Sequence, residues 1–520
     1  MPQELELSVS PEIGFDPLAL KEFTREMLGI SKEEKWQLIP IRRSIDSRGK
    51  KVKVILKIQV YRNEPVPQDS FPAPQYQNVS NAKEVFIAGA GPGGLFAALR
   101  LIELGYKPVI FERGKDVRSR RRDLAAINKK HIVNPDSNYC FGEGGAGTYS
   151  DGKLYTRSNK RGDIRAVLNT FFAHGAVKEI LIDTHPHIGT NKLPDIIVSM
   201  RETILSSGGE IHFNSRITDI LHENGSIKGI KINDSAILKG KALILATGHS
   251  ARDIYEMLQR GKVRLEFKPF ALGVRIEHPQ HLIDSIQYHC DSRGRFLPPA
   301  SYALVEQIES RGVYSFCMCP GGIIAPCATK EGQVVTNGWS PSKRNNPFAN
   351  SGIVVEIKQE DIPENYLQFD ELCGMYFQES IEELACKAGG GNQTAPVQRM
   401  VDFVNGKISS TIPGSSYIPG VASANLLEVL PKNVHTRLQQ AFIGFGKKMK
   451  GYFTNEALLH AVESRTSTPV RIPRDPLNLQ HPDISGLFPC GEGAGFAGGI
   501  VSAAMDGRKC AESVDLWLKN

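Results

Sequence analysis

The chain has 520 residues, of which 41% are hydrophobic and 23% are charged. This composition is typical of a globular protein with two or three domains, and it excludes the disordered and fibrous classes. The formal net charge of +7 is mild for this length, so it permits phosphate-bearing ligands or RNA without requiring either.

No run of about 18 apolar residues is present, so the sequence predicts no membrane span. The N-terminal stretch MPQELELSVSPEIG is acidic and polar, whereas a secretory signal is basic and then apolar. The nine cysteines are odd in number and irregularly spaced, which favours a reducing compartment over a disulfide framework. We therefore expect a cytoplasmic protein.

The pattern of residues 1–62 predicts a small N-terminal module. Residues 4–9 alternate apolar and polar side chains as a strand does, and residues 17–28 carry apolar side chains at helical spacing. Two further alternating segments, the second running from Val52 to Val60, predict two more strands. This β-α-β-β order indicates half of a ferredoxin-like unit.

The rest of the chain divides by pattern. Residues 63–82 contain four prolines among polar residues and predict an extended linker. Residues 83–265 alternate strands and helices, as the first part of a nucleotide-binding domain would. Residues 266–462 lose that alternation and predict an inserted α+β substrate or cap domain. Residues 463–520 then predict the second part of the nucleotide-binding domain.

A glycine motif lies between the first apolar strand and the first helix of residues 83–265. Gly89 permits a tight turn, Gly91 lets the backbone approach a pyrophosphate, and Gly94 lets helix and strand pack closely. The free amides and the dipole of the helix start favour a phosphate there. Glu112 ends the next strand and is placed to bind a ribose diol. This context favours a dinucleotide site over a merely structural glycine turn. The expected contacts are Gly89, Gly91, Gly93, Gly94, Glu112 and Arg113.

A late segment, residues 487–507, decides between NAD and FAD. It resembles the segment of glutathione-reductase-type flavoproteins that returns to the first domain. There an acidic residue contacts the ribityl–pyrophosphate region, and a helix N-terminus faces the flavin and stabilises its reduced form. The alternative is a tightly packed helix that needs small residues. An Ala-Thr-Gly segment ending at Gly248 also resembles these flavoproteins. The resemblance implies FAD contacts from Gly248, Gly491, Glu492, Gly498, Gly499 and Ile500.

Longer motifs are similar to those of a bacterial family of FAD-dependent dehydrogenases, many of them named NAD-utilizing dehydrogenases. They occupy residues 42–48, 142–154, 185–190, 271–280, 463–472 and 491–500. The resemblance implies bound FAD and a redox role, and it does not identify a substrate. It implies an α/β fold with a Rossmann-type FAD-binding domain of the three-layer ββα kind. We also expect an inserted α+β substrate domain and an N-terminal βαββ ferredoxin-like module.

Between these motifs lie further candidates for the cofactor and for catalysis. Gly144, Gly145 and Thr148 belong to a glycine-rich turn whose amides can form an anion nest. Arg120 is placed near the pyrophosphate, although its basic run is equally typical of a solvated helix face. Lys153 can neutralise a developing flavin or substrate anion. The alternative there is a structural turn with exposed charges.

His185 and His187 alternate, so on an extended segment both point the same way. Either can donate a proton to substrate, or serve as a hydrogen-bonded scaffold. Arg465 lies in a polar run with Thr466, Ser467 and Arg471, which can orient an anionic substrate. The predicted catalytic residues are Lys153, His187 and Arg465.

Cys317, Cys319 and Cys327 do not match the ligand spacing of zinc or iron–sulfur sites, so no metal is predicted. A buried strand with small, soft residues is the favoured interpretation. The sequence has no second GxGxxG motif, so a separate NAD domain is not expected. Any NAD(P)H would act as a transient electron donor near the flavin.

The function predicted from the sequence is that of an FAD-dependent oxidoreductase. It would pass hydride or electrons between NAD(P)H or another donor and a small organic substrate. One alternative is an FAD-dependent RNA-modifying enzyme, although no basic and aromatic residues interleave as nucleic-acid binding favours. A polyprenyl or lipid double-bond reductase is another, and it predicts a long apolar tunnel. A non-enzymatic flavin sensor is the third, and the oligomeric state is left open.

Overall fold

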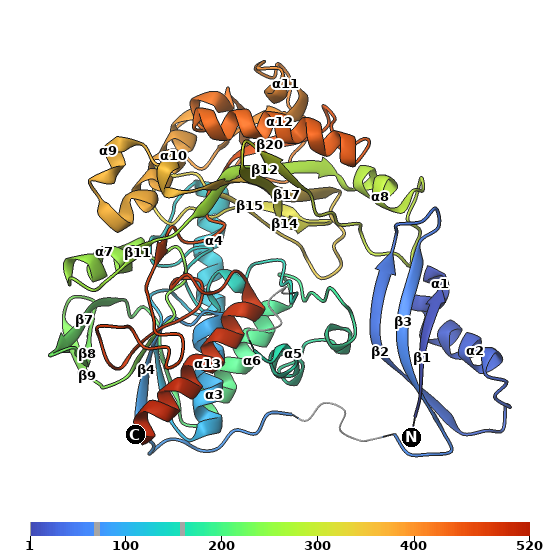
Figure 1. Ribbon diagram of the computed structural model, residues 1–520, viewed down its shortest axis with the longest axis horizontal. Helices are drawn as coiled ribbons and strands as arrows, with labels where there is room; N and C mark the ends of the chain where they lie inside the picture. Colours follow the sequence, from blue (N-terminus) through green and yellow to red (C-terminus); the bar gives the residue numbers. More distant parts are fainter. Residues whose placement is uncertain (1, 67–72, 156–161) are drawn as a thin grey trace.

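A computed structural model describes residues 2–66, 73–155 and 162–520 of the chain. Residues 67–72 of the predicted linker lie outside the described residues. Figure 1 shows a small N-terminal sheet at one side, a parallel sheet with its helices below, and a larger antiparallel sheet above. Within the described part, no helix has both the length and the hydropathy that crossing a bilayer requires.

The N-terminal module is a three-stranded sheet with two helices on one face. Its strands lie in the order β1 (Gln3–Val9), β3 (Lys53–Arg62) and β2 (Trp36–Asp46), and the helices are α1 (Pro11–Phe15) and α2 (Pro17–Met27). The central strand β3 is antiparallel to both neighbours. Its alternate residues Val54, Leu56, Ile58 and Val60 are buried with Leu20 of α2. The period-2 pattern of the sequence therefore coincides with the buried face.

A five-stranded parallel sheet forms the centre of the second part. Its order is β22 (Leu487–Pro489), β10 (Leu243–Leu245), β4 (Glu84–Ala88), β5 (Lys107–Phe111) and β6 (Glu210–His212). Val85 and Ile87 of β4 pack into one hydrophobic core, and Phe86 and Ala88 pack into another. Both faces of the sheet are thus covered, as parallel sheets require.

Different layers cover the two faces. Helices lie on one face, namely α3 (Pro92–Leu104), α5 (Ile164–Ala173), α6 (Leu193–Ser206) and α13 (Ile500–Lys519). A small antiparallel sheet lies on the other, with strands β7 (Ile217–Glu223), β8 (Ser226–Ile232) and β9 (Ala236–Lys239). This arrangement of a helical layer, a parallel sheet and an antiparallel sheet fits a Rossmann-type fold.

Helices α3 and α13 pack against each other at unusually short range. A Cβ on Gly507 of α13 would collide with the carbonyl oxygen of Gly93 of α3. The two helices follow β4 and β22, which are parallel strands of one sheet, so both helix N-termini lie at its carboxyl edge. In open α/β sheets this edge is where ligands bind.

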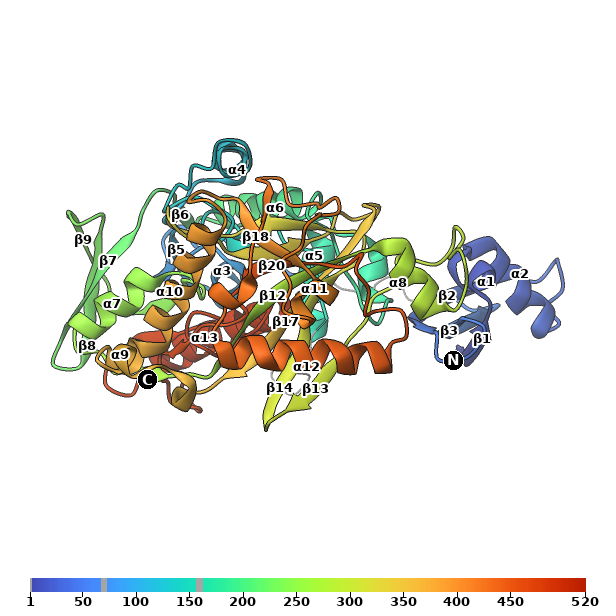
Figure 2. The ribbon, with the colours of Figure 1, turned by 90° about the horizontal axis from the view of Figure 1, so that it is seen from above.

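The third part is a seven-stranded sheet. Its order is β13 (Val305–Ile308), β14 (Arg311–Cys319), β17 (Phe348–Ile357), β12 (Phe270–Pro279), β20 (Leu458–Glu463), β18 (Ala395–Arg399) and β19 (Val421–Ser423). Only β18 and β19 pair in parallel. Figures 1 and 2 show α12 (Lys432–Lys448) on the outer face of this sheet, away from the parallel sheet.

The remaining elements connect these sheets or cover their edges. The helices are α4 (Val117–Lys130), α7 (Arg252–Arg260), α8 (Gln280–Tyr288), α9 (Glu364–Leu367), α10 (Cys373–Ala388) and α11 (Met400–Val404). The short strands are β11 (Glu266–Phe267), β15 (Ile323–Pro326), β16 (Thr336–Trp339) and β21 (Val470–Arg471). Strands β15 and β16 form a hairpin, and β11 pairs with β21.

Candidate functional site

A cavity of about 370 Å³ receives residues from both the parallel sheet and the seven-stranded sheet. Its lining residues include two groups that differ in chemistry, the glycine side and the thiol side. The glycine side consists of Gly89, Gly91, Gly93, Gly491, Gly498 and Gly499. The thiol side consists of Lys153, Cys317, Cys327, Trp339, Arg465 and Thr466.

The turn between β4 and α3 supplies half of the glycine side. Gly89 has φ +97°, and a Cβ there would lie 2.6 Å from the carbonyl oxygen of Ala246. The first amide bonded within the helix is that of Leu95, to Gly91 O at 2.9 Å, so the amides of Gly91 and Gly93 have no partner among the described residues. A Cβ on Gly91 would meet nothing nearer than Gly145 Cα at 4.0 Å. The space in front of Gly91 therefore belongs to the cavity.

Gly94 has a different role, because it does not line the cavity. A Cβ on Gly94 would collide with the carbonyl oxygen of Gly89. Its lack of a side chain therefore serves the packing of the helix on its own turn. This is the packing role that the third glycine of such a motif has.

Glu112, directly after β5, is buried and lines the cavity. Its carboxylate accepts hydrogen bonds from the amides of Ala90 at 2.8 Å, Gly114 at 2.9 Å and Gly142 at 3.0 Å. Glu112 thus holds three loop segments together around the glycine motif. Its Oε2 accepts only the Ala90 bond among the described residues, so it keeps acceptor capacity for a ribose hydroxyl.

The two arginines predicted beside Glu112 lie in different places. Arg113 lines the cavity, pairs with Asp136 at 2.7 Å and Asp253 at 2.8 Å, and lies over the Phe141 ring. Arg120 is fully buried and does not line the cavity. It donates to the carbonyl oxygens of Asn138 at 2.7 Å and Glu143 at 3.0 Å. The solvated-face alternative is therefore wrong for Arg120, which braces the loop behind the cavity.

The glycine-rich turn after Phe141 contributes Gly145 to the cavity but neither Gly144 nor Thr148. Thr148 Oγ1 donates to the carbonyl oxygen of Glu143 at 2.6 Å, behind the lining residues. A Cβ on Gly145 would lie 3.1 Å from Gly91 Cα. The two glycine turns therefore touch, and Gly144 and Thr148 shape the turn that makes this contact.

The turn before α13 completes the glycine side. The amide of Gly491 donates to Asp506 Oδ2 at 2.7 Å, and Arg474 pairs with the same carboxylate at 2.6 Å. Glu492 lines the cavity and pairs with His249 Nδ1 at 3.1 Å. Gly248 lines it beside His249, and Gly498, Gly499 and Ile500 line it at the start of the helix. The N-terminus of a 20-residue helix therefore opens on the cavity.

Cys490, Asp506 and Cys510 present ligand atoms within 4.8 Å of one another, as a metal site would. Both Asp506 oxygens are, however, bonded to the Arg474 guanidinium, at 2.6 and 2.9 Å. Arg474 Nη1 also lies 3.6 Å from Cys510 Sγ. A guanidinium thus already supplies the positive charge that a metal ion would bring to this group.

Lys153 lies at the centre of the thiol side. Its Nζ donates to the carbonyl oxygen of Met318 and lies 3.8 Å from Cys317 Sγ and 3.9 Å from Cys319 Sγ. Asp151, only 1% exposed, lies 4.0 Å from the same ammonium and lines the cavity. Burial opposes the charge of Lys153, but Cys317, Cys319 and Asp151 raise its pKa. Asp151 is buried and Lys153 is half-buried, so the alternative of a turn with exposed charges is wrong.

The two predicted histidines do not share one environment. His185 is exposed and lies 4.6 Å from the Tyr155 ring. His187 pairs with Lys153 in a β-bridge, and its Nε2 lies 3.1 Å from the carbonyl oxygen of Ser342. Burial and the charge of Arg344 lower the pKa of His187 to about 4. His187 is thus neutral at pH 7, and it does not line the cavity.

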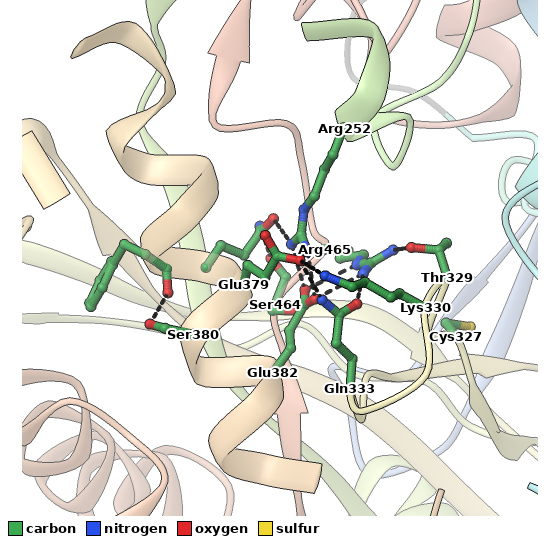
Figure 3. A network of polar contacts seen from close by, with 12 residues as sticks. Arg252, Cys327, Thr329, Lys330, Gln333, Glu379, Ser380, Glu382, Ser464 and Arg465 are labelled. Carbon is green, nitrogen blue, oxygen red and sulfur yellow. Dashed lines mark hydrogen bonds and ion pairs between the residues drawn. The ribbon is translucent and has the colours of Figure 1, made fainter. Parts of the chain in front are cut away.

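Arg465 lines the cavity, but its guanidinium is engaged within the protein (Figure 3). It bonds to Glu382 at 2.8 and 3.0 Å, to Thr329 Oγ1 at 2.8 Å and to Gln333 Oε1 at 3.2 Å. Glu382 also accepts from Arg252 at 3.0 Å, and although burial opposes this, the two arginines lower its pKa to about 2. This buried network ties β20 and the chain after it to α10.

The chain is similar to a protein from Clostridium beijerinckii that carries the description "Uncharacterized protein". The two are 42% identical over 508 residues, which is 94% of each chain. They belong to one family. Residues 269–466 match the family described as "FAD-dependent protein, C-terminal domain-like", and residues 1–61 match a domain of unknown function. The residues that match this model include all seven strands of the seven-stranded sheet.

Two more distant similarities extend this comparison. A 4,4'-diapophytoene desaturase from Methylomonas is 42% identical over 50 residues, one tenth of each chain. A geranylgeranyl bacteriochlorophyll reductase-like protein from Thermoplasma acidophilum is 12% identical and covers 84% of this chain and 79% of its own, with a TM-score of 0.34. At that score the likeness is too weak to support an argument about function.

Several residues that line the cavity lie outside the sequence motifs. His249 follows the predicted Gly248 directly, so its proximity could have been inferred. Trp339 and Asn337 come from the hairpin of β15 and β16, which carries no recognisable motif. Cys317 was expected in a buried strand, but it is half-buried and lines the cavity. That expectation is wrong for Cys317, although Cys319 and Cys327 are buried.

Proposed function

We propose that the protein is an FAD-dependent oxidoreductase whose FAD lies along the glycine side of the cavity. One observation carries this proposal. The N-termini of α3 and α13, with the glycine turns before them, open on one cavity that a Cβ on Gly91 would enter. Free helix amides favour the pyrophosphate, and the glycines let the cofactor approach the backbone. The match of residues 269–466 to an FAD-dependent protein family supports it.

The chain's own residues fit such a cofactor. Gly91 and Gly93, at the start of α3, would hold the pyrophosphate, and Glu112 would accept a hydrogen bond from the adenosine ribose. Gly498, Gly499 and Ile500 would present the start of α13 to the flavin ring. Glu492, held by His249 at 3.1 Å, would bind the ribityl chain. FAD, when bound, supplies the two-electron redox chemistry.

The predicted catalytic residues would then have distinct roles. Lys153 is the residue that would contact substrate or flavin, because its ammonium lies at the cavity and favours negative charge there. His187 is a positioning residue that pairs with Lys153 through the backbone. Arg465 is also a positioning residue, since its guanidinium bonds to Glu382, Thr329 and Gln333. We propose a small organic substrate and NAD(P)H as a transient electron donor.

Substitution of Gly91 tests the cofactor site. A Cβ on Gly91 would enter the space in front of the turn and meet no atom nearer than 4.0 Å, so we expect Gly91→Val to occupy cofactor space rather than to strain the fold. We expect FAD content to fall at least about tenfold, with an unchanged circular dichroism spectrum. Gly49→Val, in an exposed turn, is the control and should keep its FAD. Full FAD occupancy in Gly91→Val would contradict the proposal.

The electron donor is tested by anaerobic titration of the FAD-loaded protein with NADH and with NADPH. Loss of the oxidised flavin absorbance with one nucleotide would identify the donor. Lys153→Met should slow that reduction or the following oxidation by substrate, whereas Lys330→Met, at an exposed position, should not. If neither nucleotide reduces the flavin, the NAD(P)H proposal is wrong and the substrate itself is the donor.

A further inference from the structure

The end of β14 carries an irregularity that brings a thiol to the cavity. The pairing of β14 with β17 shifts register between Phe316 and Cys319. Cys317 lies in this shift with φ +45°, a left-handed conformation that is uncommon for residues other than glycine. Such bulges re-aim side chains next to active sites. As a result Cys317 lines the cavity, while Cys319 stays buried behind it.

Two cations hold this pair of thiols. Lys153 Nζ lies 3.8 Å from Cys317 Sγ and 3.9 Å from Cys319 Sγ. Arg275 Nη2 lies 3.7 Å from Cys319 Sγ and donates to the carbonyl oxygen of Cys317 at 2.8 Å. The Cys319 thiol lies 3.3 Å from that same carbonyl oxygen and donates to it. Both sulfurs are therefore within reach of a positive charge.

The charged groups around the thiols do not balance. Asp151 pairs with Arg344 at 3.1 Å and lies 4.0 Å from Lys153. Glu463 pairs with Arg275 at 2.9 Å. Lys153, Arg275 and Arg344 thus carry three positive charges. Asp151 and Glu463 carry two negative charges, so one positive charge has no partner among these groups. A thiolate on Cys317 would neutralise this charge, and nearby cations favour thiolate formation.

The two thiols also differ in acidity. The neighbouring Cys319 thiol and the charges of Lys153 and Arg275 hold the pKa of Cys317 well below its usual value. Burial raises the pKa of Cys319 well above its usual value. One sulfur is therefore disposed to be a thiolate that faces the cavity, and the other a protonated thiol behind it.

We propose that Cys317 is a nucleophilic thiolate that exchanges with a small, anionic disulfide, and that Cys319 resolves the product. The Cys317 sulfur attacks one sulfur of the disulfide, forming a new S–S bond as the old one breaks. The leaving thiolate takes up a proton. Cys319 then loses its proton and attacks the Cys317 sulfur, releasing the second thiol. The cysteine pair loses two electrons, and the disulfide gains them.

The experiment uses the full-length protein and 5,5′-dithiobis(2-nitrobenzoate), an anionic disulfide that releases a coloured thiolate, with peptide mass spectrometry. At pH 7 the Cys317 peptide should react at least about tenfold faster than the Cys290 peptide. The pair should release two thiolates and end as a Cys317–Cys319 disulfide. Cys319→Ser should release one thiolate and keep the mixed disulfide.

Lys153 variants separate an electrostatic role from a structural one. Lys153→Met should slow the Cys317 reaction about tenfold at pH 7 and shift its pH profile upward, while Lys153→Arg should restore most of the rate. Cys290→Ser is the control and should leave the Cys317 reaction unchanged.

The proposal would be overturned by a Cys317 peptide no more reactive than that of Cys290, or by an unshifted pH profile in Lys153→Met. A mixed disulfide that persists in the unsubstituted protein would disprove the resolving role of Cys319. The exchange needs no flavin. A protein that binds no FAD but reacts as described would therefore overturn only the proposed function.

Discussion

The glycine side and the thiol side of the cavity are built by different physical means. The glycine side depends on close backbone approach, as where a Cβ on Gly507 would collide with Gly93. The thiol side depends on buried charges, such as the Arg275–Glu463 pair at 2.9 Å. Substitutions on the first side should act through steric overlap. Substitutions on the second side should act through uncompensated charge, and the two kinds of effect can be told apart.

The largest expected effect is on the glycine side. Gly94→Val would force a side chain into the carbonyl oxygen of Gly89, so we expect a loss of more than about 5 kcal/mol in the free energy of unfolding. Thermal melting of the FAD-free protein measures this. Gly91→Val is the matched comparison and should melt close to the unsubstituted protein. Equal melting of the two variants would show that the glycines of this turn do not have separate roles.

The buried network around Arg465 should give the next largest effect. Arg465→Met breaks a fully buried ion pair and leaves Glu382 with one arginine fewer. Breaking a buried pair lowers the free energy of unfolding by about 3–5 kcal/mol. Lys330→Ala removes an exposed ion pair with Glu379 and should cost less than about 1 kcal/mol. Denaturant unfolding compares them. A loss at Arg465 as small as at Lys330 would contradict the positioning role.

Much of the glycine side could be predicted from the sequence, because most of its residues lie between β4 and α3 or between β22 and α13. The glycines, Glu112 and Glu492 follow apolar strands, and parallel strands bring their carboxyl ends to one edge. The thiol side could not be predicted in this way. Cys317 and Lys153 are 164 residues apart, and a register shift in β14 decides which thiol faces the cavity.

The charged residues show the same limit. The run around Arg120 gives no sign that its side chain is buried, because the carbonyl groups that bind it come from the loop at Asn138 and Glu143. For Arg465, a local polar run indicated a substrate contact. Its partner Glu382 lies 83 residues earlier on α10, so only the tertiary structure reveals the pairing.

Buried histidines provide a pH-dependent test. Burial lowers the pKa of His187, His278 and His460 to about 4, whereas unfolded histidine titrates near pH 6.5. Between pH 4 and pH 6.5 these histidines bind protons in the unfolded chain but not in the folded one. The contribution of the three histidines to stability is therefore complete above pH 6.5 and is lost as the pH falls to 4. Each should contribute about 2–3 kcal/mol to the difference in unfolding free energy between pH 7 and 4.5.

Thermal melting at pH 7 and pH 4.5 checks this expectation. The melting temperature should fall less on acidification in His278→Asn than in the unsubstituted protein. His281 is exposed, so His281→Asn is the control and should keep the full acid sensitivity. Identical pH profiles for all three proteins would contradict the neutral, buried state of His278.

The smallest expected effect concerns the N-terminal module, which touches neither side of the cavity. Arg43 on β2 pairs with Asp183 at 2.7 Å and is only partly buried. Arg43→Ala should therefore change the free energy of unfolding by no more than about 1 kcal/mol and leave FAD content unchanged. Loss of FAD in this variant would show that the module supports the cavity.

The central claim is that the glycine side holds FAD, and the FAD content of the purified full-length protein tests it most directly. The protein would be incubated with FAD, separated from free cofactor, denatured, and assayed for released flavin by chromatography. We predict close to one FAD per chain. A protein that releases no flavin, even after incubation with excess FAD, would contradict the account.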